Sequence, residues 1–202
     1  MIALIDYGMG NLGSVQKGLE RAGIDVRITD SPAVIRDAAG IVLPGVGALV
    51  AALENIRGKG LDQVIMEQIR SGKPFLGICL GLQMLFEYGE EGQGAEGLGL
   101  FKGKVVRFRH DLKVPHMGWN QLRFVNRGEV GKDIPDGAFF YFVHSYYVEP
   151  EDESIVMTRT DYGIDFVSSI TKDNVTAVQF HPEKSQRMGA MLLENFARTL
   201  KS

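Results

Sequence analysis

The sequence contains little cysteine, no excess of basic residues and no long apolar run, and each of these shortages excludes a class of protein. The single cysteine, Cys79, excludes an internal disulfide and a cysteine-rich metal site, and it favours a cytoplasmic location. The formal net charge of −3 provides neither the basic patch that binds nucleic acid nor a polybasic membrane anchor. The N-terminal apolar run at 2–6 is short and follows no positive charge, so we expect no signal peptide and no membrane span.

The 202 residues are expected to form one domain, 1–202, because 45% of them are hydrophobic and 23% are charged, as in ordinary globular proteins. Strands and helices alternate in the first half: we expect strands at 2–6, 25–29, 40–45 and 73–78, and helices from 12 and 32 and at 46–57, 61–70 and 79–88. From residue 98 consecutive strands follow, and a helix from about residue 185 closes the chain. This pattern predicts a three-layer α/β/α fold with a mostly parallel central sheet and an antiparallel extension in the C-terminal half.

The opening segment MIALIDYGMGNLG contains the pattern G-x-G-x-x-G at Gly8, Gly10 and Gly13, which is typical of dinucleotide-binding sites. An acidic residue, Asp30, follows about twenty residues later. Three features weaken this interpretation. Asp6 would place a carboxylate beside the pyrophosphate, Asp30 is also an ordinary strand-end residue, and no second mononucleotide-binding half follows. We therefore expect no cofactor.

The segment GICLG at 77–81 lies between an apolar strand and a helical pattern, and it has the form G-x-C-x-G. This is the cysteine version of a nucleophile elbow, in which flanking glycines allow a tight, strained turn. The start of the helix favours the thiolate of Cys79, and the N–H of Leu80 points to the site where an oxyanion forms. The alternative is a buried structural cysteine, which is the commoner environment of a lone cysteine.

A thiol nucleophile needs a base, and His181 is the best placed of the four histidines. It follows the apolar strand VTAVQF, and Glu183 lies two residues later, so both side chains point to one side of an extended chain. His181 can then meet the thiol while Glu183 orients the imidazole. The alternative is a surface His-Pro loop after a strand.

The segment PGVG at 44–47 closes the third expected strand and has a glycine on each side of Val46. These glycines allow the peptide at Val46 and Gly47 to rotate and to donate a second N–H to an oxyanion. Without the other motifs, the segment predicts only an ordinary turn at the end of a strand.

Together, GICLGLQ, PGVG and FHPEK resemble the class I glutamine amidotransferases that use a Cys-His-Glu triad. PHMGWN and the PGVG form of the turn narrow the resemblance to the glutaminase subunits of imidazole glycerol phosphate synthase, and it extends over the whole chain. The resemblance implies that Cys79 attacks the side-chain amide of glutamine, that His181 moves the proton and that Glu183 orients His181. Ammonia would pass to a (β/α)8-barrel cyclase subunit, the partner in a heterodimer that makes imidazole glycerol phosphate and an aminoimidazole carboxamide ribotide in histidine biosynthesis.

The resemblance also assigns the other site residues. It implies an oxyanion hole of Val46, Gly47 and Leu80, substrate contacts at Gln83, Glu91, His144, Ser145 and Tyr146, and partner contacts at Asn11, Trp119, Tyr141 and Lys184. The opening glycines would make the turn that brings Asn11 to the partner. Trp119, the only tryptophan, is expected to be an exposed aromatic anchor, with a core tryptophan as the alternative. Because the Val46 peptide would need to rotate, we expect the isolated subunit to be nearly idle.

Three other functions stay open at this point. The nearest is the glutaminase subunit of a different amidotransferase, such as anthranilate synthase, which the identity of the partner would distinguish. A cysteine hydrolase of free γ-glutamyl compounds would be active without a partner. A non-catalytic nucleotide-binding module would bind a dinucleotide and would not need Cys79.

Overall fold

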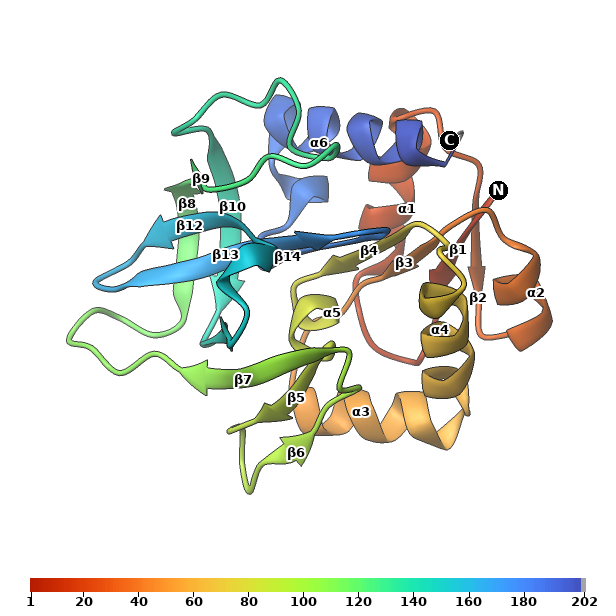
Figure 1. Ribbon diagram of the computed structural model, residues 1–202, viewed down its shortest axis with the longest axis horizontal. Coiled ribbons are helices and arrows are strands. Elements are labelled where there is room, and N and C mark those ends of the chain that lie inside the picture. Colours follow the sequence, from red (N-terminus) through yellow and green to blue (C-terminus); the bar gives the residue numbers. More distant parts are fainter. Residues whose placement is uncertain (201–202) are drawn as a thin grey trace.

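A computed structural model describes residues 1–200, in which helices cover both faces of a large mixed β-sheet (Figure 1). The N-terminal part contains β1 (Ile2–Ile5), α1 (Leu12–Arg21), β2 (Val26–Thr29), α2 (Pro32–Asp37), β3 (Ile41–Leu43), α3 (Leu49–Gly58), α4 (Leu61–Arg70), β4 (Phe75–Ile78) and α5 (Leu80–Gln83). The C-terminal part contains β5 (Phe86–Gly89), β6 (Ala95–Glu96), β7 (Phe101–Arg107), β8 (His116–Gln121), β9 (Arg123–Phe124), β10 (Phe139–His144), β11 (Tyr146–Pro150), η1 (Glu153–Ile155), β12 (Val156–Asp161), β13 (Asp165–Lys172), β14 (Val175–Val178), η2 (Pro182–Lys184) and α6 (Gln186–Thr199). No helix within 1–200 is long and apolar enough to cross a membrane.

The main sheet has the strand order β2-β1-β3-β4-β14-β13-β11-β7-β5-β6. The strands from β2 to β14 in this order are parallel, whereas β13, β11 and β7 continue the sheet with antiparallel pairing. The expected fold class is therefore confirmed. The late strand β14 lies directly beside β4, with Val178 opposite Ile78, so the residues that follow these two strands meet at the same edge.

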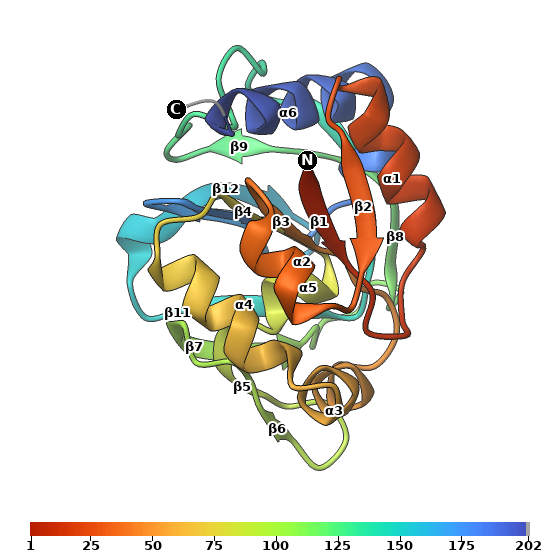
Figure 2. The ribbon, with the colours of Figure 1, turned by 90° about the vertical axis from the view of Figure 1, so that its right-hand side faces the viewer.

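The parallel strands are buried on both faces, as the continuous apolar sequence of β1 indicates. Successive residues point to opposite sides: Ala3 and Ile5 join one hydrophobic cluster, and Ile2 and Leu4 join the other. The cluster on one face contains residues of α1 and α6, at the top and upper right of Figure 2, and the cluster on the other face contains residues of α2, α3 and α4. These helices complete the three layers.

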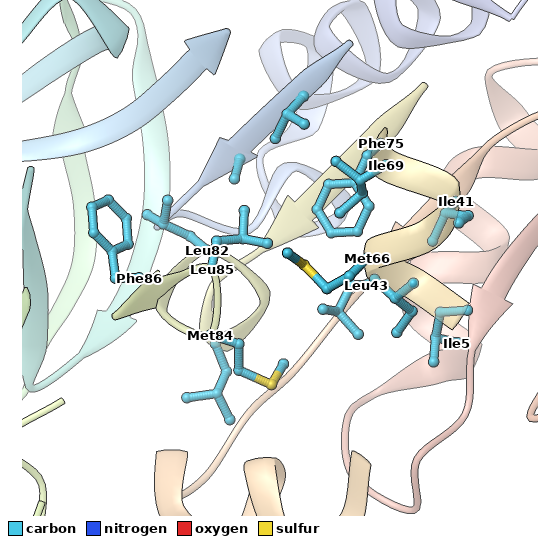
Figure 3. Close-up of a cluster of buried hydrophobic side chains, with 14 of the residues drawn as sticks. Ile5, Ile41, Leu43, Met66, Ile69, Phe75, Leu82, Met84, Leu85 and Phe86 are labelled. Atoms are coloured by element: carbon cyan, nitrogen blue, oxygen red, sulfur yellow. The ribbon is translucent and has the colours of Figure 1, made fainter. Parts of the chain in front are cut away.

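The cluster on the side of α4 packs the sheet against this helix (Figure 3). Ile5, Leu43 and Phe75 come from neighbouring strands and are fully buried. Met66 and Ile69 lie three residues apart in α4 and therefore face the sheet together. Each large side chain buried in this way stabilises the fold by about 1.5–3 kcal/mol.

The expected helix at 79–88 is wrong beyond Gln83. The helix α5 is a single turn, and the chain then extends into β5. The carbonyl of Met84 accepts the N–H of Leu98 across 2.7 Å, and β5 pairs with β7. Tertiary strand pairing thus overrides the helical spacing of a short apolar segment.

The strands β8 and β10 also differ from the expectation, which added all later strands to the parallel sheet. They form a separate two-stranded antiparallel sheet in which Trp119 lies opposite Tyr141. The N–H of His181 donates to the carbonyl of Tyr141 across 2.9 Å, so this small sheet is tied to the segment that follows β14.

Candidate active site

Cys79 lies between β4 and the single turn of α5, where the carboxyl ends of the parallel strands meet. Its φ of +54° and ψ of −104° strain a residue that carries a side chain. Its N–H donates to the carbonyl of Val178 across 2.7 Å, which ties the turn to β14. The strained strand-to-helix turn expected from the sequence is therefore present.

The two glycines that flank this turn are needed because backbone passes very close to them. A Cβ on Gly77 would lie 2.9 Å from the carbonyl oxygen of Gly81. A Cβ on Gly81 would overlap the carbonyl oxygen of Leu43 in β3. Only glycine at both positions lets β3, β4 and α5 pack this tightly.

His181 and Glu183 come to the same site from the end of β14 and from η2. Nδ1 of His181 lies 2.8 Å from Oε1 of Glu183, and both side chains are buried. Burial lowers the pKa of His181, but the nearby Cys79 sulfur and Glu183 carboxylate outweigh burial and raise this pKa to about 9. Among residues 1–200, nothing hydrogen-bonds to Nε2 of His181, so this nitrogen is the one available to the thiol and to a substrate.

A cavity of about 290 Å³ opens in front of Cys79. It is lined by Val46, Gly47, Cys79, Leu80, Gln83, Glu91, Pro115, Val143, His144, Ser145 and Tyr146. The structure therefore brings every expected oxyanion-hole and substrate residue to one cavity beside the thiol. Its volume lies at the small end of ligand sites and suits a small polar molecule.

In this structure the turn at 44–47 accepts hydrogen bonds from two neighbouring residues, one of which is an expected oxyanion donor. The N–H of Leu80 donates to the carbonyl oxygen of Gly45 across 3.3 Å, so this donor is occupied. The phenol of Tyr7 donates to the carbonyl of Pro44 across 3.0 Å, and burial raises the phenol's pKa, which keeps it a donor. Rotation of the Val46 peptide stays a prediction.

Among the expected substrate residues, Glu91 and His144 form hydrogen bonds within the protein. The carboxylate of Glu91 accepts the N–H of Leu49 at the start of α3. Nδ1 of His144 lies 2.8 Å from the carbonyl of Tyr146, and its Nε2 lies 2.9 Å from Nδ1 of His116. Both ring nitrogens of His144 are thus engaged, so other atoms of this residue must face the cavity.

Three of the four expected partner residues gather beside the small sheet. The ring of Trp119 packs edge-on against Tyr141 with 6.1 Å between centroids, and Nζ of Lys184 lies 5.7 Å from the centroid of Tyr141. Trp119 is exposed, so it is not a core tryptophan. Asn11 is exposed at the start of α1, where its side chain accepts the N–H of Ser14.

The opening glycines form a turn, with φ of +89° at Gly8 and +116° at Gly10. The carboxylate of Asp6 accepts the N–H of Gly8 across 2.9 Å, which is an amide that a pyrophosphate would need. Asp30 forms an ion pair with Lys59 at 3.0 Å. These contacts favour a structural turn over a dinucleotide site.

Gln179 is a site residue that the sequence interpretation missed. It follows β14 directly, and its Nε2 lies 3.6 Å from the Cys79 sulfur. Its position two residues before His181 was the available signal, since both side chains then point to one side of an extended chain. The described residues contain no group of three or more His, Cys, Asp or Glu side chains that could hold a metal ion.

Residues 3–200 match the family described as glutamine amidotransferase class-I. A relative from Aquifex aeolicus called imidazole glycerol phosphate synthase subunit HisH is 54% identical over 196 residues, which cover 96% of this chain and 95% of the relative. The protein of the same name from Moorella thermoacetica is 52% identical over 200 residues, with 99% and 95% covered.

Solved structures resemble the fold at much lower sequence identity. One described as a crystal structure of glutamine amidotransferase superposes with a TM-score of 0.79 at 18% identity, covering 100% of both chains. The structure of PurLQS from Thermotoga maritima superposes with a TM-score of 0.74 at 18% identity, covering 98% of both chains. At this identity the similarity concerns the fold alone.

Proposed function

The chain belongs to the class I glutamine amidotransferase family, and we propose that Cys79, His181 and Glu183 are the triad with which it releases ammonia from glutamine. It acts as the glutaminase subunit of imidazole glycerol phosphate synthase in histidine biosynthesis, like the HisH relatives that match 96% and 99% of its length. The observation that carries the triad is the buried pair of His181 and Glu183, which lies beside the Cys79 sulfur on its strained turn and leaves Nε2 of His181 without a protein partner.

The triad geometry supports thioester chemistry. The thiolate of Cys79 attacks the side-chain amide carbon of glutamine, and the C–N bond breaks as His181 gives its Nε2 proton to the leaving ammonia. Water then attacks the γ-glutamyl thioester and loses a proton to His181, which releases glutamate and the thiolate. In both steps Nδ1 of His181 donates a hydrogen bond to Oε1 of Glu183, which lies 2.8 Å away and keeps the imidazole oriented.

The oxyanion of each tetrahedral intermediate needs N–H donors beside Cys79. We propose that Leu80 supplies one after its N–H leaves the Gly45 carbonyl, and that the rotated peptide at Val46 and Gly47 supplies the other. The bond between Leu80 and Gly45 supports a subunit that is idle until this turn rearranges.

We propose that the partner is a (β/α)8-barrel cyclase subunit that forms a heterodimer on the small sheet. Met117, Trp119 and Phe139 are 62%, 46% and 52% exposed, and the strand register places them on one face with Tyr141. Exposed aromatic and apolar side chains that gather in this way are typical of a protein interface. Because Tyr141 also bonds to the backbone of His181, a partner on this face would lie next to the triad and could receive ammonia without releasing it to water.

We further propose that residues 1–202 form a single domain and that the protein is cytoplasmic. One family match spans residues 3–200, and both hydrophobic clusters pack on one sheet. The one cysteine, Cys79, is free and buried, which suits a reducing compartment.

Glutamate release should rise by roughly 10²- to 10³-fold when the cyclase and its nucleotide ligand are added, because an oxyanion donor is worth a factor of this size. The assay measures glutamate from glutamine with the purified chain alone, with the cyclase, and with the cyclase plus ligand.

Trp119→Ala should require more cyclase for half-maximal stimulation. Val125→Ala is the control, because it removes another exposed apolar side chain outside the small sheet.

Equal activity with and without the cyclase would contradict both the gating turn and this partner. Stimulation by a different synthase, such as the synthase subunit of anthranilate synthase, would assign the chain to the nearest alternative.

Glutamine hydrolysis by the complex should fail as the pH rises through about 9, the pKa to which Cys79 and Glu183 raise His181. The imidazolium that protonates ammonia is present below this pKa and lost above it. Glu183→Gln should move the alkaline fall of kcat/KM to lower pH, because the carboxylate no longer raises the pKa. Glu153→Gln, at an exposed ion pair with Arg159, is the control and should leave the profile unchanged. If the alkaline fall of kcat/KM stays at the same pH in Glu183→Gln, the proposed effect of Glu183 on the pKa of His181 is wrong.

A further inference from the structure

The amide of Gln179 is a buried polar group that the triad chemistry does not use. Gln179 is 0% exposed, and it lies beside Cys79 because β14 and β4 are neighbouring strands. Its backbone N–H donates to the carbonyl of Ser168 across 2.8 Å, which fixes the start of the side chain. The side-chain Nε2 then lies 3.6 Å from the Cys79 sulfur, a distance suited to a hydrogen bond to sulfur.

The neighbours of Gln179 determine which end of its amide faces the sulfur. Nε2 of Gln83 lies 3.2 Å from the carbonyl oxygen of Tyr146 and 3.0 Å from Oε1 of Gln179. A backbone carbonyl only accepts, so the Gln83 atom near it must be the NH2 group. That NH2 group needs the oxygen of Gln179 on its other side, which leaves the NH2 group of Gln179 directed at the sulfur.

A second chain of hydrogen bonds ends at the same Tyr146 carbonyl, which also accepts from His144. Nδ2 of Asn120 lies 3.2 Å from Nε2 of His116 and donates to a backbone carbonyl, so Nε2 of His116 accepts. Nδ1 of His116 then donates to Nε2 of His144, and Nδ1 of His144 donates to Tyr146. Burial lowers the pKa of His116 to about 4 and that of His144 to about 3, so both rings are neutral and each has the single N–H that this order requires.

We propose that Gln179 is a further catalytic residue, whose side-chain N–H holds the Cys79 sulfur in position and stabilises its thiolate. Hydrogen bonds to a charged group are stronger than neutral ones, and both Cys79 and Gln179 are buried, which strengthens this contact. His181 faces the sulfur as the proton carrier, and Gln179 adds a donor that keeps its own proton. Gln179 has this role only if Cys79 is the nucleophile, as proposed above.

The same network limits how Gln83 can bind substrate. Both of its N–H bonds are directed to Tyr146 and Gln179. Its side-chain oxygen is therefore the atom left to accept an N–H from glutamine in the cavity.

The test replaces Gln179 by methionine and, in a second variant, by leucine, which fill similar space without a donor. The rate of Cys79 alkylation by iodoacetamide is measured against pH in the isolated chain, which needs neither glutamine nor partner. We expect the rate at pH 7 to fall by about 10-fold and the midpoint of the pH profile to rise by about one unit. In the complex with the cyclase, kcat for glutamine should fall by a similar factor while KM changes less, because Gln179 contacts the sulfur.

Gln68→Met is the matched control, since Gln68 is a nearly buried glutamine in α4 whose amide donates to Glu67 instead. A folded variant of Gln179 that keeps the wild-type alkylation rate and pH midpoint would overturn the role of Gln179. A wild-type chain without glutaminase activity in the complex would instead overturn the proposed function, so the two failures are distinguishable.

Discussion

Cys79→Ala should reduce glutamate release in the complex by about 10⁴-fold or more, the scale on which removal of a triad nucleophile acts. The variant keeps the residues that line the cavity and can still bind glutamine, but without the thiol it cannot form the thioester. The measurement is glutamate production with saturating cyclase and ligand, together with a test of complex formation, which should be unchanged. Retained activity in Cys79→Ala would return the residue to the role of a buried structural cysteine.

A second substitution at the same position tests the strain of the turn. Cys79→Gly should be as inactive as Cys79→Ala, yet it should unfold at an equal or higher denaturant concentration. Alanine keeps the Cβ that is unfavourable at φ +54°, and glycine removes it. A Cys79→Gly variant that is less stable than Cys79→Ala would show that the turn stores no strain at this residue.

Gly81→Ala should destabilise the protein by roughly 3 kcal/mol or more, because overpacking against backbone cannot be relieved by a side-chain rotation. The added Cβ would overlap the carbonyl oxygen of Leu43, so β3 and α5 must separate. Chemical denaturation monitored by fluorescence of Trp119 would measure the loss. The folded fraction should also lose activity, because the shift moves the N–H of Leu80.

Gly58→Ala is the matched control for this prediction. Gly58 ends α3, and an added Cβ there would meet no atom within 4 Å. Alanine also has the higher helix propensity, so the change should be neutral or stabilising by up to about 1 kcal/mol. Equal stability of Gly58→Ala and Gly81→Ala would contradict the packing assigned to the turn.

Several elements of the fold could be predicted because their signals are local. Helix α1 follows from regularly spaced apolar residues that end before Gly23, and β1 follows from an apolar run that is buried on both faces. The segment after Gln83 was mispredicted because its apolar spacing suits a helix, while its backbone bonds to residues near Leu98. Pairing with a distant strand cannot be predicted from the apolar spacing of a short segment.

The candidate site divides in the same way. Cys79, His181 and the PGVG turn stand in short patterns whose chemistry can be interpreted residue by residue. Gln179 stands in no such pattern, and its importance comes from a contact with a residue 100 positions away in the sequence. The hydrogen bond from the N–H of Leu80 to Gly45 could not be predicted from the sequence either, because it depends on how the turn at Gly45 packs against α5.

The sequence by itself determined the class of fold and predicted a nucleophile and its base, since periodicity, glycine placement and the spacing of His181 and Glu183 act over a few residues. Only the tertiary structure decided that β14 lies beside β4, that the small sheet stands apart, and that a chain of amides ends at the sulfur of Cys79. These features depend on which distant segments pack together, and that choice is made by the burial and hydrogen bonding of the whole chain.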